Sequence, residues 1–289
     1  MPSPAFHSPR SIADAVAMLA ADSGARVLSG GTDLIVQMQS QRIAPSAVID
    51  IKRIDGMIGV RSEAGGFIIG AATPCTALQE DKALVAAWPG VVEAANLIGS
   101  VQVRNRATMA GNLCNASPAA DSVPALVAAG ATCLVAGPAG TREVAVEAIT
   151  TAPGRTSLGV GEFLIELRLP ARPRGGSDAY LRSIPRTEMD IAVVGCGAAL
   201  VLDASGTCTS ARVALGAVAP TVLLVEAAAA ALVGSKLDAA ALDALAEVVC
   251  AACRPIDDKR GTAAYRTAMA GILARRVVSI AAERAGASK

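Results

Sequence analysis

A segment rich in proline and glycine divides this sequence into two parts with different patterns. It runs from Pro170 to Ser177 as Pro-Ala-Arg-Pro-Arg-Gly-Gly-Ser, a composition typical of a connection between domains. Short apolar runs separated by glycine turns precede it, and two long strand-like runs followed by helical patterns come after it. The sequence therefore predicts an α+β protein whose second domain is a small antiparallel sheet packed against helices.

The apolar patterns before and after this segment predict individual helices and strands. Helices are expected after a cap at Ser11 and from Thr73 onward. Asp121 or Ser122 is expected to cap the helix containing Pro124, because proline is tolerated in a first helical turn. The expected strands of the first part are 26–28, 47–51, 66–71, 131–136, 142–146 and 164–169. The second part should contain strands 191–202 and 207–218 and helices 222–233, 239–253 and 262–285.

The charge balance and the cysteines narrow the partners and the environment. Lys and Arg total 26 against 25 Asp and Glu in 289 residues, so no positive field draws the chain to nucleic acid. The seven cysteines are scattered and odd in number, which favours reduced thiols in the cytoplasm over a disulfide framework. Glu226 interrupts the longest apolar run before it reaches the roughly 18 residues of a membrane helix. We therefore expect a cytoplasmic protein without an integral membrane segment.

The scarcity of histidine and the spacing of the cysteines limit the chemistry of this chain. His7 is the only histidine, which argues against Ser-His triads, histidine proton shuttles and imidazole-rich zinc sites. Cys250 and Cys253 form a Cys-x-x-Cys pair, but a zinc site or an iron-sulfur cluster needs about four ligands and no second pair occurs. Buried thiols in a helix are the favoured interpretation. We predict no metal site and no catalytic acid or base.

A glycine turn near the N-terminus joins a predicted strand to a predicted helix. The turn is Ser29-Gly30-Gly31-Thr32-Asp33, between the strand 26–28 and the helical pattern 34–39. This order aims free backbone N–H groups and the positive end of a helix at a phosphate. The motif is short, so a glycine turn without a ligand fits the same residues.

The segment from Gly99 to Asp121 is a second candidate for ligand binding, and we call it the amide-rich segment. It reads Gly-Ser-Val-Gln-Val-Arg-Asn-Arg-Ala-Thr-Met-Ala-Gly-Asn-Leu-Cys-Asn-Ala-Ser-Pro-Ala-Ala-Asp. Its length is unusual for a loop inside a compact domain, and long loops are often functional. Small and amide side chains let backbone N–H groups approach a phosphate or a heterocycle. An ordinary surface loop, whose Asn and Ser satisfy their own turns, is the alternative.

Several of these stretches together resemble one protein family. The residues are Ser29 to Leu34, Gln102 to Asp121, Met189-Asp-Ile-Ala192, Leu215 to Pro220 and Asp258 to Arg266. They are similar to the FAD-binding medium subunit of molybdenum hydroxylases, the family of xanthine dehydrogenase and aerobic carbon monoxide dehydrogenase. The resemblance implies a two-subdomain FAD-binding domain of the vanillyl-alcohol-oxidase (PCMH) type over residues 1–172, with subdomains of about 1–55 and 56–172. A carbon monoxide dehydrogenase flavoprotein C-terminal domain should follow at 173–289.

The resemblance also implies which residues contact FAD. The glycine turn with its flanking residues, here called the first loop, should wrap the diphosphate through Val27, Leu28, Ser29, Gly30, Gly31, Thr32, Asp33 and Leu34. The amide-rich segment, here called the second loop, should contribute Thr108, Gly111, Asn112, Cys114, Asn115 and, on the flavin side, Asp121. Apolar ring contacts are implied for Ile98 and for Leu164 or Ile165, and a cation beside the isoalloxazine for Arg182. Ala110 stands where many relatives have glycine, so its methyl group could crowd the diphosphate.

The function implied by the resemblance is electron relay. FAD would take electrons from the iron-sulfur clusters of a small [2Fe-2S] subunit and pass them to NAD, oxygen or another acceptor. A large molybdenum-cofactor subunit would hydroxylate the substrate, in a dimer of heterotrimers. The arginines of the predicted helix 262–285 then face either solvent or a subunit. A free-standing FAD-dependent oxidoreductase and an assembly or structural subunit that has lost FAD are the alternatives.

Overall fold

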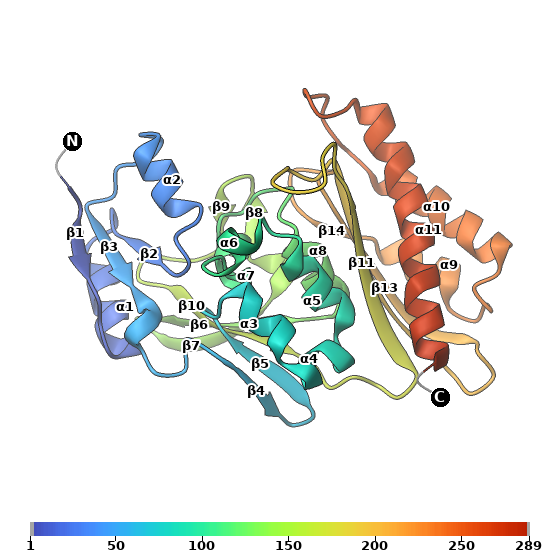
Figure 1. The fold of residues 1–289 in the computed structure, drawn as a ribbon, viewed down its shortest axis with the longest axis horizontal. Helices are drawn as coiled ribbons and strands as arrows, with labels where there is room; N and C mark the ends of the chain where they lie inside the picture. Colours follow the sequence, from blue (N-terminus) through green and yellow to red (C-terminus); the bar gives the residue numbers. More distant parts are fainter. Residues whose placement is uncertain (1–2, 288–289) are drawn as a thin grey trace.

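The computed structural model describes residues 3–287, and its N-terminal block is a small parallel sheet with two helices (Figure 1). The strands are β1 (Ala5–His7), β2 (Arg26–Leu28) and β3 (Ala47–Asp50), in the order β1-β3-β2. Parallel strands need crossover connections, which α1 (Ile12–Ala21) and α2 (Leu34–Gln39) supply. Ser11 begins α1 as expected, because its hydroxyl accepts the backbone N–H of Asp14 at 3.1 Å.

The middle block is an antiparallel sheet covered by a layer of short helices. The strand order is β4-β5-β10-β6-β7. The strands are β4 (Val60–Glu63), β5 (Gly66–Gly70), β6 (Thr132–Gly137), β7 (Gly140–Ala145) and β10 (Phe163–Leu169). The helices are α3 (Cys75–Glu80), α4 (Lys82–Ala87), α5 (Pro89–Asn96), α6 (Val101–Arg104), α7 (Met109–Cys114) and α8 (Ser122–Ala128). Smaller elements at its edges are η1 (Ile51–Arg53), η2 (Val146–Ala148) and the paired strands β8 (Thr150–Ala152) and β9 (Arg155–Thr156).

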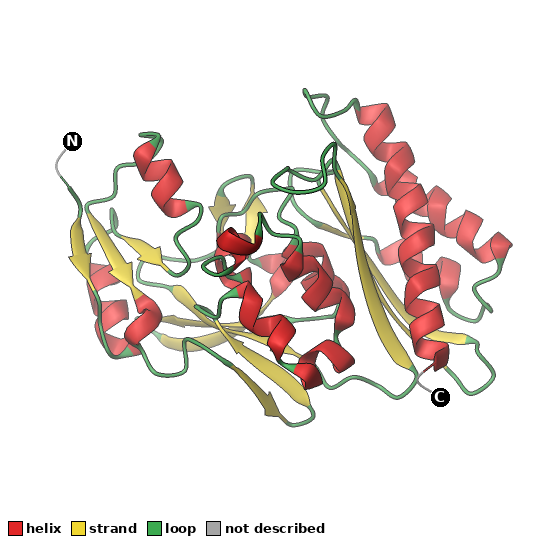
Figure 2. Ribbon diagram, in the orientation of Figure 1, coloured by secondary structure: helices red, strands yellow, loops and turns green. Residues whose placement is uncertain are grey.

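The C-terminal block is a second antiparallel sheet with helices on its outer face (Figure 2). Its strands are β11 (Gly176–Ser183), β12 (Val194–Leu202), β13 (Cys208–Gly216) and β14 (Leu223–Leu224). Its helices are α9 (Glu226–Leu232), α10 (Ala239–Ala252) and α11 (Ala263–Ala287). The side chains of β12 and β13 that are buried against these helices form a hydrophobic core separate from that of the middle block. The α+β class and the C-terminal antiparallel sheet packed on helices are confirmed.

Helix α8 lies between the two antiparallel sheets and is buried along its whole length (Figure 1). A Cβ atom at Gly197 of β12 would stand 2.7 Å from the carbonyl oxygen of Pro124, and one at Gly216 of β13 would stand 2.9 Å from Cγ of the same proline. Only glycine therefore allows the sheet to approach the helix this closely. The backbone of α8 packs directly on the C-terminal sheet.

A buried ion pair joins the C-terminal sheet to the start of α5. Asp178 on β11 is paired with Arg172, and its Oδ2 atom accepts the backbone N–H of Val91 at 3.0 Å. Arg172 also donates to the carbonyl of Ala87 at 2.6 Å, and its guanidinium lies 3.5 Å from the centre of the Trp88 ring. Every polar atom of Asp178 thus has a partner at a position that water does not reach.

Three sequence expectations are wrong in detail. The amide-rich segment is not a structureless loop, because α6 and α7 form within it. Thr73 does not cap a helix: its hydroxyl bonds Gly59 across the chain, and α3 begins after Pro74 without a side-chain cap. The segment 222–233 starts as the short strand β14, because Leu223 pairs with Leu215 before α9 begins.

The helix expected from Thr262 is confirmed as α11. Within residues 3–287, no helix is both long and apolar enough to span a bilayer.

The hairpin between β4 and β5 offers a test of local backbone strain. Ala64 and Gly65 both adopt positive φ angles, +50° and +79°, as a type I′ turn requires, and alanine is disfavoured there. Ala64→Asn is expected to raise the free energy of unfolding by about 0.5–1 kcal/mol, since asparagine tolerates this conformation better. Chemical denaturation measures the change. Ala139→Asn, at an exposed turn residue without a positive φ, should stay within about 0.5 kcal/mol of the parent protein; an equal gain there would contradict the explanation.

Candidate cofactor-binding site

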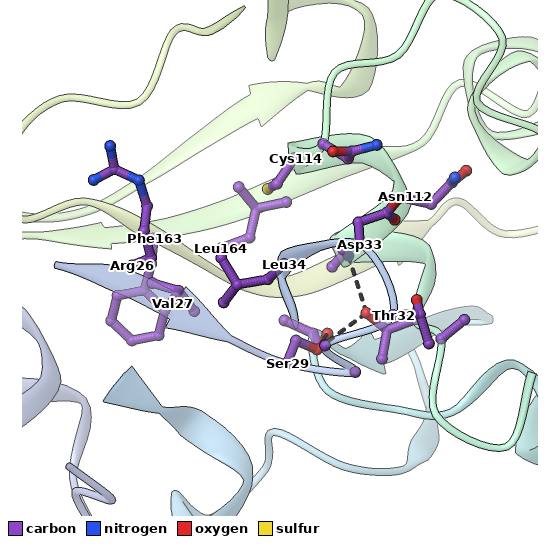
Figure 3. A pocket seen from close by; sticks show the side chains of 18 of the residues that line it. Arg26, Val27, Ser29, Thr32, Asp33, Leu34, Asn112, Cys114, Phe163 and Leu164 are labelled. Atoms are coloured by element: carbon purple, nitrogen blue, oxygen red, sulfur yellow. Dashed lines mark hydrogen bonds between the residues drawn. The ribbon is translucent and has the colours of Figure 1, made fainter. Parts of the chain in front are cut away.

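A cavity of about 430 Å³ opens between the N-terminal block and the helices of the middle block. Most of the residues expected to contact FAD line it, although they come from distant parts of the chain. From the first loop these are Val27, Ser29, Gly30, Gly31, Thr32, Asp33 and Leu34. From the rest of the chain they are Ile98, Thr108, Gly111, Asn112, Cys114, Asn115 and Leu164. Figure 3 shows Ser29 and Thr32 in the lower part of the view and Cys114 and Asn112 in the upper part, with Asp33 between them.

The first wall is the glycine turn between β2 and α2. Its Ser29 hydroxyl donates to the carbonyl of Ala71 at 2.9 Å, and its carbonyl accepts Lys52 Nζ at 3.0 Å. Gly31 has a φ of +80°, a conformation that glycine adopts without steric cost. A Cβ atom at Gly30 would lie 2.0 Å from the carbonyl oxygen of Arg106. The absence of a side chain at Gly30 lets the two loops touch backbone to backbone.

The second wall is α7 with its flanking turns. The Thr108 hydroxyl caps α7 by accepting the N–H of Gly111 at 2.9 Å, and it lies 3.0 Å from the Ser29 hydroxyl across the cavity. Asn112 Oδ1 accepts both the N–H and the hydroxyl of Ser122, at 3.1 and 2.8 Å. These bonds hold α7 against the first loop on one side and against α8 on the other.

Four expected residues lie outside the lining of the cavity: Leu28, Ile165, Asp121 and Arg182. Leu164 and Ile165 both belong to the hydrophobic core, but of the two only Leu164 lines the cavity. Asp121 accepts a hydrogen bond from Arg182 Nη1 at 2.8 Å, and both side chains are buried. Asp121 occupies the N-cap position of α8, one of the two expected alternatives, but its side chain makes no capping bond. Its carboxylate pairs with Arg182 of β11 instead.

Buried polar atoms surround the Asp121–Arg182 pair. Arg182 Nε lacks a hydrogen-bond partner among the described residues, and the buried Tyr180 hydroxyl interacts with the Asp121 carboxyl. Unpaired buried polar atoms are costly and are commonly found where a ligand or water completes the site. Burial raises the pKa of the Asp121 carboxyl to about 6, against the opposing effect of Arg182.

The raised pKa of Asp121 predicts a pH-dependent stability. In the folded apoprotein this carboxyl stays protonated up to about pH 6, whereas in the unfolded chain it loses its proton above its ordinary pKa of 3.8. The stability of the protein is therefore greatest below pH 3.8 and falls as the pH rises through 6. From pH 5 to pH 7 this group alone should remove about 1 kcal/mol of unfolding free energy. Chemical denaturation at both pH values measures it against Asp121→Asn, which should lack the decrement. An identical slope in the variant would contradict the assignment.

Several lining residues were missed from the sequence. They are Arg26, Gln37, Ile43, Ile51, Ala71, Ala107, Gly154, Leu158, Glu162 and Phe163. Gln37 lies three residues after Leu34 in the expected helix 34–39 and so could have been placed on the same helical face. Gly154 and Leu158 come from turns around β9 that carry no local ligand signal. The methyl group of Ala110 is almost fully buried, so it joins the core as well as the cavity lining.

The titratable side chains that line the cavity include Asp33, the pKa of whose carboxyl is raised by burial, as well as Glu162 and Cys114. Glu162 is held by a two-point hydrogen bond from Arg142, at 2.8 Å for each atom pair, which lowers the pKa of its carboxyl. Burial raises the pKa of the Cys114 thiol to about 12, so the thiol stays protonated and is a poor nucleophile. Within residues 3–287, no group of three acidic, cysteine or histidine side chains could hold a metal. Cys250 is half-buried and Cys253 buried, and both are free thiols.

The glycines and small polar side chains of the cavity fit a bound dinucleotide. A Cβ atom at Gly30 would stand 2.0 Å from the Arg106 carbonyl oxygen on the opposite loop, and one at Gly111 would stand 2.9 Å from the Thr108 hydroxyl. The cavity therefore keeps its shape only with glycine at these two positions. Its polar lining consists mainly of hydroxyls, amides and backbone groups, which bind phosphates and sugars in the dinucleotide sites of other folds. Val27, Leu34 and Leu164 offer apolar contact to a ring system.

Comparisons with known proteins agree with this geometry. Residues 3–172 match the family model described as the FAD binding domain in molybdopterin dehydrogenase, and residues 179–281 match the CO dehydrogenase flavoprotein C-terminal domain. The carbon monoxide dehydrogenase medium chain of Hydrogenophaga pseudoflava is 36% identical over 96% of both chains. A putative xanthine dehydrogenase FAD-binding subunit of Escherichia coli is 31% identical over 97% of both.

A solved structure has the same fold over nearly the whole chain. Carbon monoxide dehydrogenase from Oligotropha carboxidovorans superposes with a TM-score of 0.94 at 36% identity, covering 98% of this chain and 99% of that one. The resemblance inferred from the sequence motifs is thereby confirmed, and FAD is the cofactor. The chain belongs to the family of FAD-binding medium subunits of molybdopterin-dependent dehydrogenases, the molybdenum hydroxylases.

Proposed function

We propose that this chain is the electron-relay subunit of a molybdenum hydroxylase complex. A small [2Fe-2S] subunit would deliver electrons to it, and a large molybdenum-cofactor subunit would oxidise the substrate, as a dimer of heterotrimers. Bound FAD supplies the exchange between single-electron donors and an acceptor such as NAD or oxygen. The observation that carries this proposal is a cavity of about 430 Å³ lined by glycines, hydroxyls and amides from the two loops, within the residues that the FAD-binding family model matches.

The residues of the site have separate tasks in this proposal. Gly30, Gly31 and Thr32 of the first loop and Thr108 and Gly111 of the second would hold the diphosphate between the loops. The remaining proposed contacts are Val27, Leu28, Ser29, Asp33, Leu34, Asn112, Cys114 and Asn115 around the cofactor, and Ile98, Leu164 or Ile165, Asp121 and Arg182 toward the flavin. A cation such as Arg182 would stabilise negative charge that develops on the reduced ring.

We also propose that the chain divides into domains at 172/173 and that it works in the cytoplasm. Support for the division comes from the separate hydrophobic cores of the middle and C-terminal blocks and from the absence of regular structure between Leu169 and Gly176. The subdomains of about 1–55 and 56–172 would then correspond to the parallel sheet and to the sheet with its helical layer. The free thiols agree with a reducing compartment.

The visible spectrum of the purified chain is the first test of the proposed function. Flavin absorption with one FAD released per chain is the expected result, together with negligible oxidation of small substrates by the isolated chain. Adding the partner subunits should then let substrate reduce the bound flavin. A colourless chain that does not take up added FAD would favour the structural alternative, whereas substrate oxidation by the chain alone would favour a free-standing oxidoreductase.

A further inference from the structure

Helix α2 covers one side of the cavity but is loosely attached to the rest of the protein. It follows the glycine turn directly, and none of its residues is buried. Ile35 is 46% exposed and Val36 is 58% exposed. Figure 1 shows α2 standing away from the sheet of the N-terminal block. Segments with so few buried contacts open locally at low free-energy cost.

The side chain of Gln37 connects α2 to the opposite wall of the cavity. Its Nε2 atom donates to Asn115 Oδ1 at 2.8 Å, across 78 positions of sequence. Both residues line the cavity. Among the side-chain hydrogen bonds of the described residues, this is the one by which α2 reaches another element.

The partner side of this bond is firmly held. Asn115 ends α7, and its backbone N–H donates to the carbonyl of Gly111 at 2.9 Å. The next residue, Ala116, is buried and accepts the N–H of Gly154 at 2.9 Å. A loosely packed helix is therefore tied by one amide–amide bond to a residue of the opposite wall whose backbone is held by hydrogen bonds.

We propose that the Gln37–Asn115 bond is a latch that closes α2 over the bound cofactor and slows its release. This inference rests on the proposed placement of FAD in the cavity. The glycine turn, with Gly31 at φ +80°, is the flexible point about which α2 turns outward. Opening breaks the latch and exposes the diphosphate, whereas closing restores the bond and shields it. Loops that close over ligands in this way set the rate of release in many enzymes.

The test is the rate at which FAD leaves the full chain, followed as loss of bound flavin after mixing with an excess of an apoflavoprotein that captures free FAD. Gln37→Ala should speed release about fivefold, the factor that corresponds to one neutral hydrogen bond. Asn115→Ala should speed release at least as much, because Asn115 is also a proposed cofactor contact. The double variant should release FAD no faster than Asn115→Ala alone, because the bond is already absent in that variant. Gln39→Ala is the matched control, since Gln39 is exposed on the same helix and does not line the cavity; its release rate should equal that of the parent.

The outcomes separate the latch from the proposed function. A further acceleration by Gln37→Ala when Asn115 is already alanine would mean that Gln37 acts independently of this bond, which overturns the latch. The same conclusion follows if Gln37→Ala releases FAD at the parent rate. A parent chain that takes up no FAD overturns the proposed function and the latch together. Thermal unfolding of the apoproteins, expected to be the same for Gln37→Ala and Gln39→Ala, shows that a changed release rate does not reflect misfolding.

Discussion

Gly30→Ala is expected to reduce FAD affinity by about a hundredfold or more, the largest effect of any single methyl group in this cavity. The added Cβ atom would stand 2.0 Å from the Arg106 carbonyl oxygen and 3.0 Å from Cα of Ala107. Both are backbone atoms of the second loop, so no side-chain rotation relieves the clash. The loops must separate, and the loss of two hydrogen bonds to a charged diphosphate, at about 1.5 kcal/mol each, corresponds to roughly a hundredfold in affinity.

Equilibrium titration of the apoprotein with FAD measures this change. The clash should also lower the free energy of unfolding by about 1–3 kcal/mol, as overpacking does elsewhere. Gly286→Ala is the control, because a Cβ atom there meets nothing within 4 Å and the residue lies in α11; its FAD affinity should be unchanged. Parental affinity in Gly30→Ala would mean that the two loops do not clamp the cofactor together.

Asp178→Ala is expected to lower the free energy of unfolding by about 3–5 kcal/mol. The substitution leaves the guanidinium of Arg172 without its carboxylate in a position where 13% of that side chain is exposed, and uncompensated buried charges are costly. It also removes the acceptor of the Val91 N–H at the start of α5. The effect should therefore appear as a loss of stability in both sheets, since the pair joins β11 to the middle block.

Denaturant unfolding followed by far-ultraviolet circular dichroism tests the prediction. The matched control is Glu63→Ala, which removes a contact of 3.8 Å between exposed side chains of Arg61 and Glu63. Exposed pairs of this kind contribute little, so the control should change stability by less than about 0.5 kcal/mol. Equal losses in the two variants would contradict the role assigned to burial.

The sequence predicts most of the local structure here because the signals are local. Ser11 caps α1 through a residue three positions away, and the glycine turn 29–33 leads from β2 into α2 as the pattern indicates. Thr73 and Asp121 show the limit of predicting helix caps from local sequence patterns. Each stands where a cap residue would, but its side chain bonds a distant partner, Gly59 or Arg182. Local patterns do not report such tertiary competition.

The site was predictable only where the family motifs named its residues. Composition marked the turn near Gly30 and the amide-rich segment separately, yet nothing local indicated that Ser29 and Thr108 come within 3.0 Å of each other. The resemblance supplied that pairing. It did not indicate Gln37, Gly154 or Leu158, whose positions depend on how α2 and the β9 turns fold over the cavity.

The burial of α8 has a mechanical consequence for the cavity. Because its backbone touches glycines of β12 and β13, the helix cannot slide without moving the C-terminal sheet. Its first residue, Ser122, is bonded twice to Asn112 in the wall of the cavity. The seven residues of α8 therefore connect the C-terminal sheet to the wall of the cavity through direct contacts. A substitution in β12 or β13 that shifts this helix is expected to displace Asn112 as well, although the substituted residue itself lies outside the cavity.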